Sequence, residues 1–194
     1  MTNELIYIIA VNVISFITYL INIHQIKRNK KIRLDIPLMI MALLLGAVGI
    51  LLCGLVFDRK STKDNMMIRV FSICILVVQI ILLIVLKNDI SNLNYNFLFF
   101  LINHKYLLIY LLIINILTFI IFAVDKYKAI KNRRRVRITV LLFLAFIGGT
   151  IGALCGIYFL RHKTKKNYFT LGVPMILLMH LIIILWIMNI DVLK

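Results

Sequence analysis

Residues 138–160, ITVLLFLAFIGGTIGALCGIYFL, contain no Asp, Glu, Lys or Arg. A helix needs roughly 20 apolar residues to cross the hydrocarbon core of a bilayer, so this stretch is long enough to do so. Gly148 and Gly149 lie at its centre, and basic residues flank both of its ends. The pattern predicts a membrane-embedded segment whose middle holds either a turn between two half-helices or a close contact with another helix.

The rest of the chain has the same apolar character. Of its 194 residues, 63% are hydrophobic and 15% are charged, whereas soluble domains carry roughly 25% charged residues. This composition excludes a disordered, collagenous or coiled-coil protein and disfavours a soluble enzyme. Further long runs lack charged side chains, at 5–26, 36–57, 70–86, 106–124 and 167–190. Because lipid cannot satisfy backbone polar groups, we expect an all-α integral membrane protein with six hydrophobic helical segments.

One uncharged run, 90–104, is shorter and contains a serine and several asparagines. We interpret residues 91–105 as an interfacial linker in loop conformation. Its aromatic side chains are expected at the level of the lipid headgroups, where aromatic residues are enriched. They are Tyr95, Phe97, Phe99 and Phe100.

The sequence repeats itself. Residues 53–65 (CGLVFDRKSTKDN) and 155–167 (CGIYFLRHKTKKN) share seven identical residues in thirteen positions. Upstream, Asn12 and Gly49 pair with Asn115 and Gly152 at a nearly constant offset. This predicts two tandem three-segment repeats, a degenerate one in 1–90 and a second in 106–194. Each reads as an apolar span, a basic loop, a glycine-centred segment, a short basic loop and a further span.

The second copy also carries a specific motif pattern, in which Asp-Lys, Gly-Gly and Arg-His-Lys-Thr follow one another at defined spacing. Its members are Asn115, Phe119, Asp125-Lys126, Ala129, Arg137-Ile138, Gly148-Gly149, Gly152-Ala153, Gly156, Arg161-His162-Lys163-Thr164 and Phe169. Over about 114–185 this pattern resembles the domain-of-unknown-function 1294 family of small bacterial and archaeal membrane proteins. The resemblance implies a multi-pass protein of a bacterial cytoplasmic membrane, and it implies no established activity.

The chain departs from the family pattern in three places. Thr139-Val140 stands where Pro-Glu usually follows Arg-Ile, so any chemistry that needs this glutamate is lost. In the first copy, Asn22-Ile23 replaces Asp-Lys, and Arg59-Lys60-Ser61 replaces Arg-His-Lys. We therefore expect one functional site, in the second copy.

Two membrane topologies compete. If the middle segment of each repeat is re-entrant, 20 Lys and Arg lie in cytoplasmic loops and 3 lie outside, the bias that the positive-inside rule demands. If both middle segments cross, the counts are 11 and 12, with no bias. A re-entrant segment gives parallel repeats with both termini outside, whereas a crossing segment gives inverted repeats. The spacing of Gly148, Gly152 and Gly156 also fits a straight helix that packs closely, so both arrangements stay open.

The candidate site is a set of polar residues in the second copy. It comprises Asp125, Lys126, Arg137, Arg161, His162 and Lys163. Asp125 is expected either to form an ion pair with one of the nearby cations, Lys126, Arg137 or Lys163, or to act as a general base. The Arg-His-Lys run is either a topological anchor or an anion site, in which arginine grips phosphate bidentately.

These residues lead to two hypotheses about function. The first is a protein without catalysis that binds or handles anionic lipid or a phosphorylated ligand at its basic cytoplasmic face. The alternative is a membrane enzyme that acts on a phosphorylated lipid or lipid-linked donor, with Asp125 and His162 as acid and base. The expected partners are anionic membrane lipids. Nucleic acid is disfavoured for lack of aromatic platforms, and a homo-oligomer is left open.

Other polar residues in the apolar runs favour structural roles. His180 lies within the last run and is expected to form a buried hydrogen bond between helices, with no counterpart in the first copy. Cys53, Cys74 and Cys155 form no metal or disulfide pattern, so we expect buried thiols, no metal and no cofactor. The spanning runs lack Asp, Glu, Lys and Arg, which disfavours an ion-coupled pump.

Overall fold

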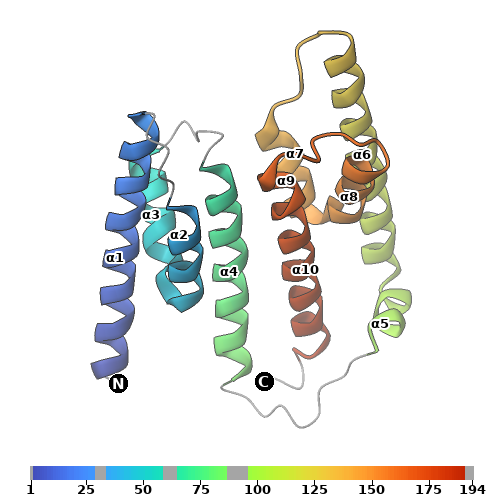
Figure 1. Ribbon diagram of the computed structural model, residues 1–194. Coiled ribbons are helices and arrows are strands. Elements are labelled where there is room, and N and C mark those ends of the chain that lie inside the picture. The colour runs from blue at the N-terminus through green and yellow to red at the C-terminus, as the bar shows by residue number, and fades with distance from the viewer. Residues whose placement is uncertain (1, 29–33, 59–64, 87–95, 191–194) are drawn as a thin grey trace. The chain divides into compact units, whose positions relative to one another are not determined.

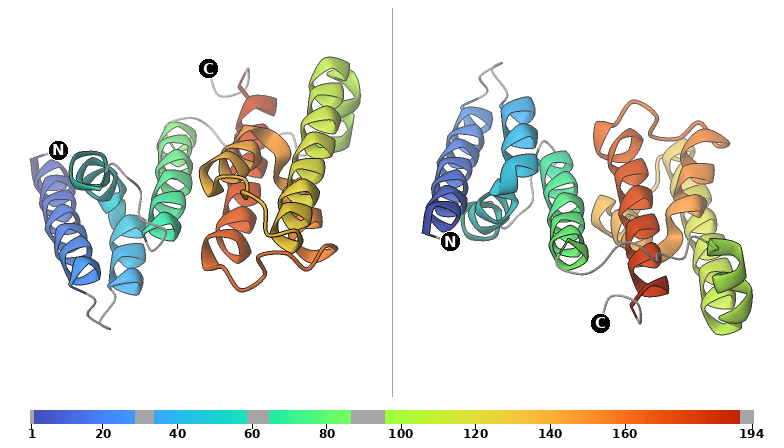
Figure 2. Two further views of the ribbon diagram at one scale, coloured as in Figure 1. Left: turned by 90° about the horizontal axis from the view of Figure 1, so that it is seen from above. Right: turned by 90° about the horizontal axis from the view of Figure 1, so that it is seen from below.

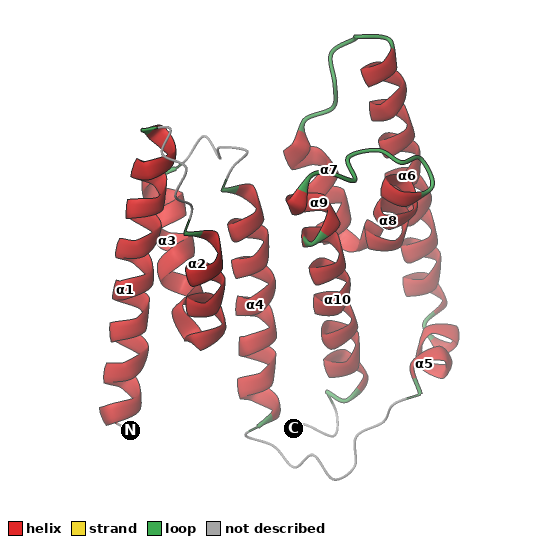
Figure 3. Ribbon diagram, viewed as in Figure 1, coloured by secondary structure: helices red, strands yellow, loops and turns green. Residues whose placement is uncertain are grey.

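The computed structural model describes residues 2–28, 34–58, 65–86 and 96–190, and its regular elements in these ranges are all helices (Figure 3). The chain divides into two compact units, Met1–Leu82 and Leu83–Lys194, and each is described by itself. Six of its helical stretches are long and apolar enough to cross a membrane, as the sequence predicts.

The first unit contains a long helix, a broken middle segment and a third helix (Figure 1). Its elements are α1 (Thr2–Lys27), α2 (Asp35–Met41), the π-helical turn η1 (Ala42–Gly46), α3 (Ala47–Phe57) and α4 (Met66–Val85). The chain reverses at η1 between α2 and α3, and α3 returns along α1 (Figures 1 and 2).

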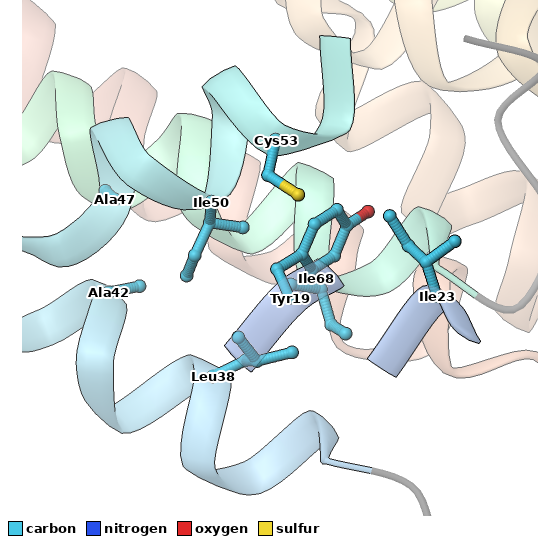
Figure 4. Packing of buried hydrophobic residues seen from close by; sticks show 8 residues of the cluster. All are labelled: Tyr19, Ile23, Leu38, Ala42, Ala47, Ile50, Cys53 and Ile68. Carbon is cyan, nitrogen blue, oxygen red and sulfur yellow. The ribbon is translucent and has the colours of Figure 1, made fainter. Parts of the chain in front are cut away.

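The core of the first unit lies where α1, the middle segment and α4 meet. Tyr19, Leu38, Ile50 and Ile68 converge there from four different helices and are almost fully buried (Figure 4). Many large apolar side chains of the same helices remain exposed, such as Leu55 on α3. Much of the surface of this unit is therefore apolar.

The second unit has the same kind of broken middle segment, preceded by a short extra helix. Its elements are α5 (Phe97–Asn103), α6 (Lys105–Ile130), α7 (Ile138–Leu144), η2 (Ala145–Gly149), α8 (Thr150–Tyr158), α9 (Asn167–Thr170) and α10 (Gly172–Met188). α5 corrects the expectation of a loop throughout 91–105. Phe97, Phe100 and Leu101 share one face of this helix and lie against α6 and α10, so packing of an apolar face stabilises it.

Both middle segments are broken at their centres. In the second unit the break is at Gly148, whose φ of 116° suits glycine and strains other residues. In the first unit the left-handed residue is Leu45, with a φ of 74°, although a glycine, Gly46, follows it directly. A leucine in this conformation costs about 1–2 kcal/mol, so the first unit makes the same turn under strain.

An asparagine of the preceding long helix satisfies the backbone groups that the break exposes. Asn115 donates from Nδ2 to the carbonyl oxygens of Gly148 (3.1 Å) and Leu111 (2.7 Å), and its Oδ1 accepts the N–H of Gly152 (2.8 Å). Asn12 makes the matching bonds in the first unit, to Leu45 (2.9 Å) and from Gly49 (2.8 Å). The amides thus replace hydrogen bonds that neither helix nor lipid supplies.

Glycine is also required where these helices touch. A Cβ atom at Gly152 would overlap the backbone oxygen of Asn115, and one at Gly49 would overlap that of Asn12. The backbones of α6 and α8, and of α1 and α3, therefore lie in direct contact, as small residues permit.

The last helix of each unit supplies another donor to the broken segment. His180 Nε2 donates to the carbonyl oxygen of Phe146 (2.8 Å), which confirms the expected hydrogen bond between helices. Gln79 Nε2 donates to the carbonyl oxygens of Ala42 (2.9 Å) and Leu43 (3.0 Å) in the first unit. Gln79 and His180 therefore each donate to the broken segment of their own unit, although the two side chains differ.

Candidate functional site

Asp125 is the centre of the candidate site in the second unit. It is completely buried near the end of α6. Its Oδ1 accepts the backbone N–H of Val136 (2.8 Å), and its Oδ2 contacts His162 Nε2 (2.8 Å) and Lys163 Nζ (2.7 Å). Val136 precedes α7 and His162 follows α8. One carboxylate therefore holds both ends of the broken middle segment at the same end of the unit.

Sharp helix endings bring these groups together. After α8, Arg161 N–H bonds to Tyr158 O (3.2 Å) and His162 N–H to Ile157 O (3.0 Å), with Arg161 at a φ of 45°. This is a Schellman ending, in which the left-handed residue is usually glycine. Lys163 is also left-handed, with a φ of 63°. The reversal of the chain at these residues directs His162 and Lys163 back to α6.

The helix α6 also ends with a left-handed residue. Asn132 has a φ of 51°, and Arg133 N–H bonds to the carbonyl oxygen of Lys128 (2.9 Å). Asparagine is among the residues that tolerate this conformation. The chain then reverses, and Val136 comes to lie beside Asp125.

Lys163 is held from two sides. Its Nζ contacts the Asp125 carboxylate and lies 4.9 Å from the centre of the buried Phe169 ring, a cation–π geometry. Phe169 packs edge-on against Phe122 of α6. Burial lowers the pKa of Lys163 below its usual range, and the neighbouring Asp125 charge opposes this effect. His162 donates its Nε2–H to the carboxylate, because a carboxylate oxygen can only accept.

The structure brings three of the six predicted site residues together and leaves three apart. Asp125, His162 and Lys163 form one cluster, called the Asp125 cluster below. Lys126 is half-buried on α6, and Arg137 and Arg161 are exposed. Within the described ranges these three make no ion pair with Asp125, so Lys163 is the cation that pairs with it among the three expected.

Exposed cations surround the Asp125 cluster. Lys131, Arg133, Arg134 and Arg135 are all exposed in the loop after α6, and Lys165 and Lys166 are exposed in the loop after α8. Residues 131–137 and 161–166 are called the basic loops below. Because Val136 and His162 bond to one carboxylate, the two loops lie at the same end of the second unit (Figure 1).

The first unit holds a different polar network at its corresponding end. Asn22 is buried, accepts the N–H of Leu34 at Oδ1 (3.1 Å) and donates to Asn65 Oδ1 (3.3 Å). Asn65 in turn donates to Asp58, whose Oδ2 lies 3.2 Å from an Arg69 guanidinium nitrogen. Arg59, Lys60 and Ser61, which were compared with the Arg-His-Lys run, lie outside the described residues.

Sequence reasoning missed the residues of this network. Arg69 also donates to the carbonyl oxygen of Gly54 (2.8 Å), and its Nε lies 3.3 Å from Tyr19 Oη. No role was predicted for Asp58, Asn65 or Arg69. The signal for their role is that one acidic residue, Asp58, ends an otherwise uncharged run, as Asp125 does.

Comparison with known proteins supports the family resemblance of the second unit. Residues 115–169 match the family described as "Protein of unknown function (DUF1294)". The chain is 36% identical over 75 residues to "Uncharacterized protein YsdA" of Bacillus subtilis (strain 168), an alignment that covers 39% of this chain and 84% of that protein. No solved structure matches. The chain belongs to the DUF1294 family, and the matched region runs from the Asn115 amide to the Phe169 ring below Lys163.

Proposed function

We propose that this member of the DUF1294 family is a multi-pass protein of a bacterial cytoplasmic membrane that binds anionic lipid through its basic loops. The observation that carries the proposal is the double attachment to Asp125. Val136 N and His162 Nε2 bond to the same carboxylate, so both basic loops face one end of the unit. Basic side chains near a membrane attract anionic lipid with about 1 kcal/mol per residue.

The proposal places both middle segments as re-entrant hairpins. Their broken centres at Leu45 and Gly148, and their return along α1 and α6, support this placement. With re-entrant segments, 20 of the 23 Lys and Arg lie on the cytoplasmic side. The matching bonds of Asn12 and Asn115 support the further proposal that the two units arose by tandem duplication.

In this proposal the six predicted site residues divide into two roles. The Asp125 cluster is internally neutralised, since Lys163 and His162 face the buried carboxylate. It fixes the loops rather than binding the lipid. Arg137 and Arg161 are exposed, and an arginine guanidinium can grip a phosphate bidentately, while the half-buried Lys126 supplies a point charge.

The proposal is tested by comparing the affinity of the protein for phosphatidylglycerol, which is anionic, with its affinity for phosphatidylcholine, which has no net charge. The purified protein is titrated with short-chain forms of each lipid in detergent. Arg161→Ala is expected to weaken phosphatidylglycerol binding about five-fold, the value of roughly one lost headgroup contact. Arg59→Ala, its counterpart in the first repeat, is the matched control and should be mild. Equal losses for both variants, or equal affinity for the two lipids, contradict the proposed site.

The contact between His162 and Asp125 favours an enzyme as the second candidate. A buried carboxylate that orients an imidazole at 2.8 Å is an arrangement that general bases use. Lys163 shares the same Oδ2 atom, however, and competes for the carboxylate charge. Mass spectrometry of phosphatidylglycerol or phosphatidic acid incubated with the protein separates the candidates. The enzyme hypothesis requires a headgroup change that His162→Gln abolishes, and the binding hypothesis requires none.

A further inference from the structure

A second candidate site lies in the second unit, away from the Asp125 cluster. An apolar cavity of about 350 Å³ opens between α5, α6, η2 and α10. Phe100, Leu111, Phe146 and Ile184 line it from these four elements. Its volume falls within the range of ligand pockets, roughly 300–1,000 Å³. Nothing in the proposed role of the basic loops uses this cavity.

The cavity runs along α6 from the start of that helix to the helix break. The α6 residues that line it extend from Leu107 to Asn115, a distance of about 12 Å along the helix axis. Gly148 and His180 line its inner end. The amide of Asn115 is fully used by backbone partners, so the wall offers mainly hydrocarbon and aromatic surface. The shape and lining suit an extended apolar chain.

The outer end of the cavity adjoins a basic rim. A smaller hollow of about 260 Å³ is lined by residues 103–107, and Leu107 lines both spaces. Lys105 is exposed there, and His104 donates from Nδ1 to the carbonyl oxygen of Phe100 (2.9 Å), which leaves Nε2 for another partner. No Asp or Glu lines either hollow in the described part of the chain. The rim therefore suits an anionic group.

We propose that this cavity binds one acyl chain of an anionic phospholipid, with the phosphate at Lys105 and His104. Water does not fill an apolar cavity, and an empty one forfeits the dispersion contacts of its walls. An amphiphile with one charged end matches the cationic rim and the apolar interior together. This proposal and the proposed function both assume that the protein lies in a membrane, and they are otherwise independent.

The two sites are well separated. Lys105 and Asp125 lie twenty residues apart on the single helix α6, about 30 Å along its axis. This distance equals the thickness of the hydrocarbon core. The cavity site therefore serves the leaflet opposite the basic loops, and either site can fail without the other.

A photoactivatable phosphatidylglycerol tests the proposal directly. The lipid carries a diazirine at the end of one acyl chain and is added at low fraction to phosphatidylcholine nanodiscs that hold the full chain. Adducts are expected on Leu111, Phe146 or Ile184, with each adduct assigned to a single residue. Adducts spread evenly over exposed lipid-facing residues such as Ile113 and Ile116 would overturn the proposal, whatever any variant does.

Paired variants then separate the chain contact from the headgroup contact. Ile184→Trp fills the cavity and should remove most adducts, whereas Leu185→Trp, on the adjacent exposed position, should remove few. Lys105→Ala should lower the labelling by the phosphatidylglycerol probe about five-fold, towards that of a matched phosphatidylcholine probe. Lys128→Ala, at the opposite end of α6, should leave labelling unchanged. If Lys105→Ala has no effect, or if Lys128→Ala has the same effect, the headgroup assignment is wrong.

Discussion

Arg161 occupies a backbone position that normally favours glycine. It lies at the left-handed residue of a Schellman ending, with a φ of 45°, and its side chain is exposed. A non-glycine residue there costs about 1–2 kcal/mol. In the proposed function this exposed arginine, which makes no side-chain ion pair in the described part of the chain, binds a ligand outside the protein.

Arg161→Gly separates the effect of the strained backbone from the effect of the arginine side chain. We expect the variant to keep or slightly raise its thermal stability, because relief of the strained φ offsets the entropy that glycine adds to the unfolded chain. Binding of phosphatidylglycerol should fall about as far as in Arg161→Ala. Thermal unfolding and lipid titration of the same samples check both effects. A variant that loses stability yet binds normally would assign Arg161 to the fold.

Asp125 has the opposite role, since its charge is used internally. Asp125→Asn keeps an acceptor for the Val136 N–H but leaves the half-buried Lys163 ammonium without its countercharge and removes the carboxylate that faces His162 Nε2. Removing one partner of a buried ion pair costs about 3–5 kcal/mol. We expect a fall in the unfolding temperature on the order of 10 °C, measured by thermal denaturation in detergent. Lys126→Ala is the control and should change little, and equal effects of the two would remove Asp125 from its central position.

All three residues of the Asp125 cluster were predicted from the sequence, but not which of the six candidates would form the cluster. Asp125 and the Arg-His-Lys run stand out because charges are rare in this chain and both adjoin apolar runs. Which cations turn inward depends on the left-handed φ of Arg161 and Lys163. Neither is a glycine or an asparagine, the residues that usually adopt this conformation, so the turn could not be predicted from residue type.

At the scale of elements, the centre of each middle segment is the most constrained backbone. Gly148→Leu is expected to destabilise the second unit by about 1–3 kcal/mol, because a side chain at a φ of 116° is strained and would press on Leu111. Leu45→Gly, at the equivalent break, should be neutral or stabilising, since it releases the left-handed leucine. Comparison of unfolding temperatures checks the pair. A loss in Leu45→Gly as large as in Gly148→Leu would contradict the shared turn.

The asparagine that bridges each break is expected to stabilise the fold through several backbone hydrogen bonds at once. Asn115→Leu leaves the Gly152 N–H and the Gly148 carbonyl without partners, at about 1–3 kcal/mol each. We expect faster hydrogen exchange at the Gly152 amide and a lower unfolding temperature. Thr118→Val is the matched control on the same helix, because that hydroxyl donates only to Ile114 O within its own helix. Similar exchange in both variants would show that the bridge is dispensable.

The sequence predicted the helices that follow from apolar composition. It missed the features that depend on a few specific tertiary contacts. The apolar runs predicted six helical segments, and the central glycines left a break or a straight, closely packed helix open in the middle of each copy. The pairing of Gln79 with the break in the first unit was missed, because glutamine and histidine do not align as identities. The helix α5 was missed because its stability comes from packing on α6 and α10, which no local pattern reveals.

At the scale of the whole molecule, the path of the middle segments through the membrane links the fold to the proposed function. If the middle segments are hairpins, the loops before and after each of them lie on one membrane face, and the positive-inside rule is satisfied. If these segments cross, the basic loops of each unit lie on opposite faces, and a common lipid-binding face does not exist. Charge counting alone favoured the hairpin. The shared bonds of Val136 and His162 to Asp125 give it a physical basis in the second unit.

Single-cysteine labelling tests this claim most directly. Cys53, Cys74 and Cys155 are replaced, and cysteines are placed singly at the exposed positions Arg134 and Thr164, one in each basic loop. A membrane-impermeant maleimide is then applied to intact cells and to inside-out vesicles, and Asn29 and Ser61 are tested likewise in the first unit. We predict that each pair reacts only in inside-out vesicles. Labelling of Thr164 from outside while Arg134 reacts from inside would contradict the hairpin, and with it the common lipid-binding face.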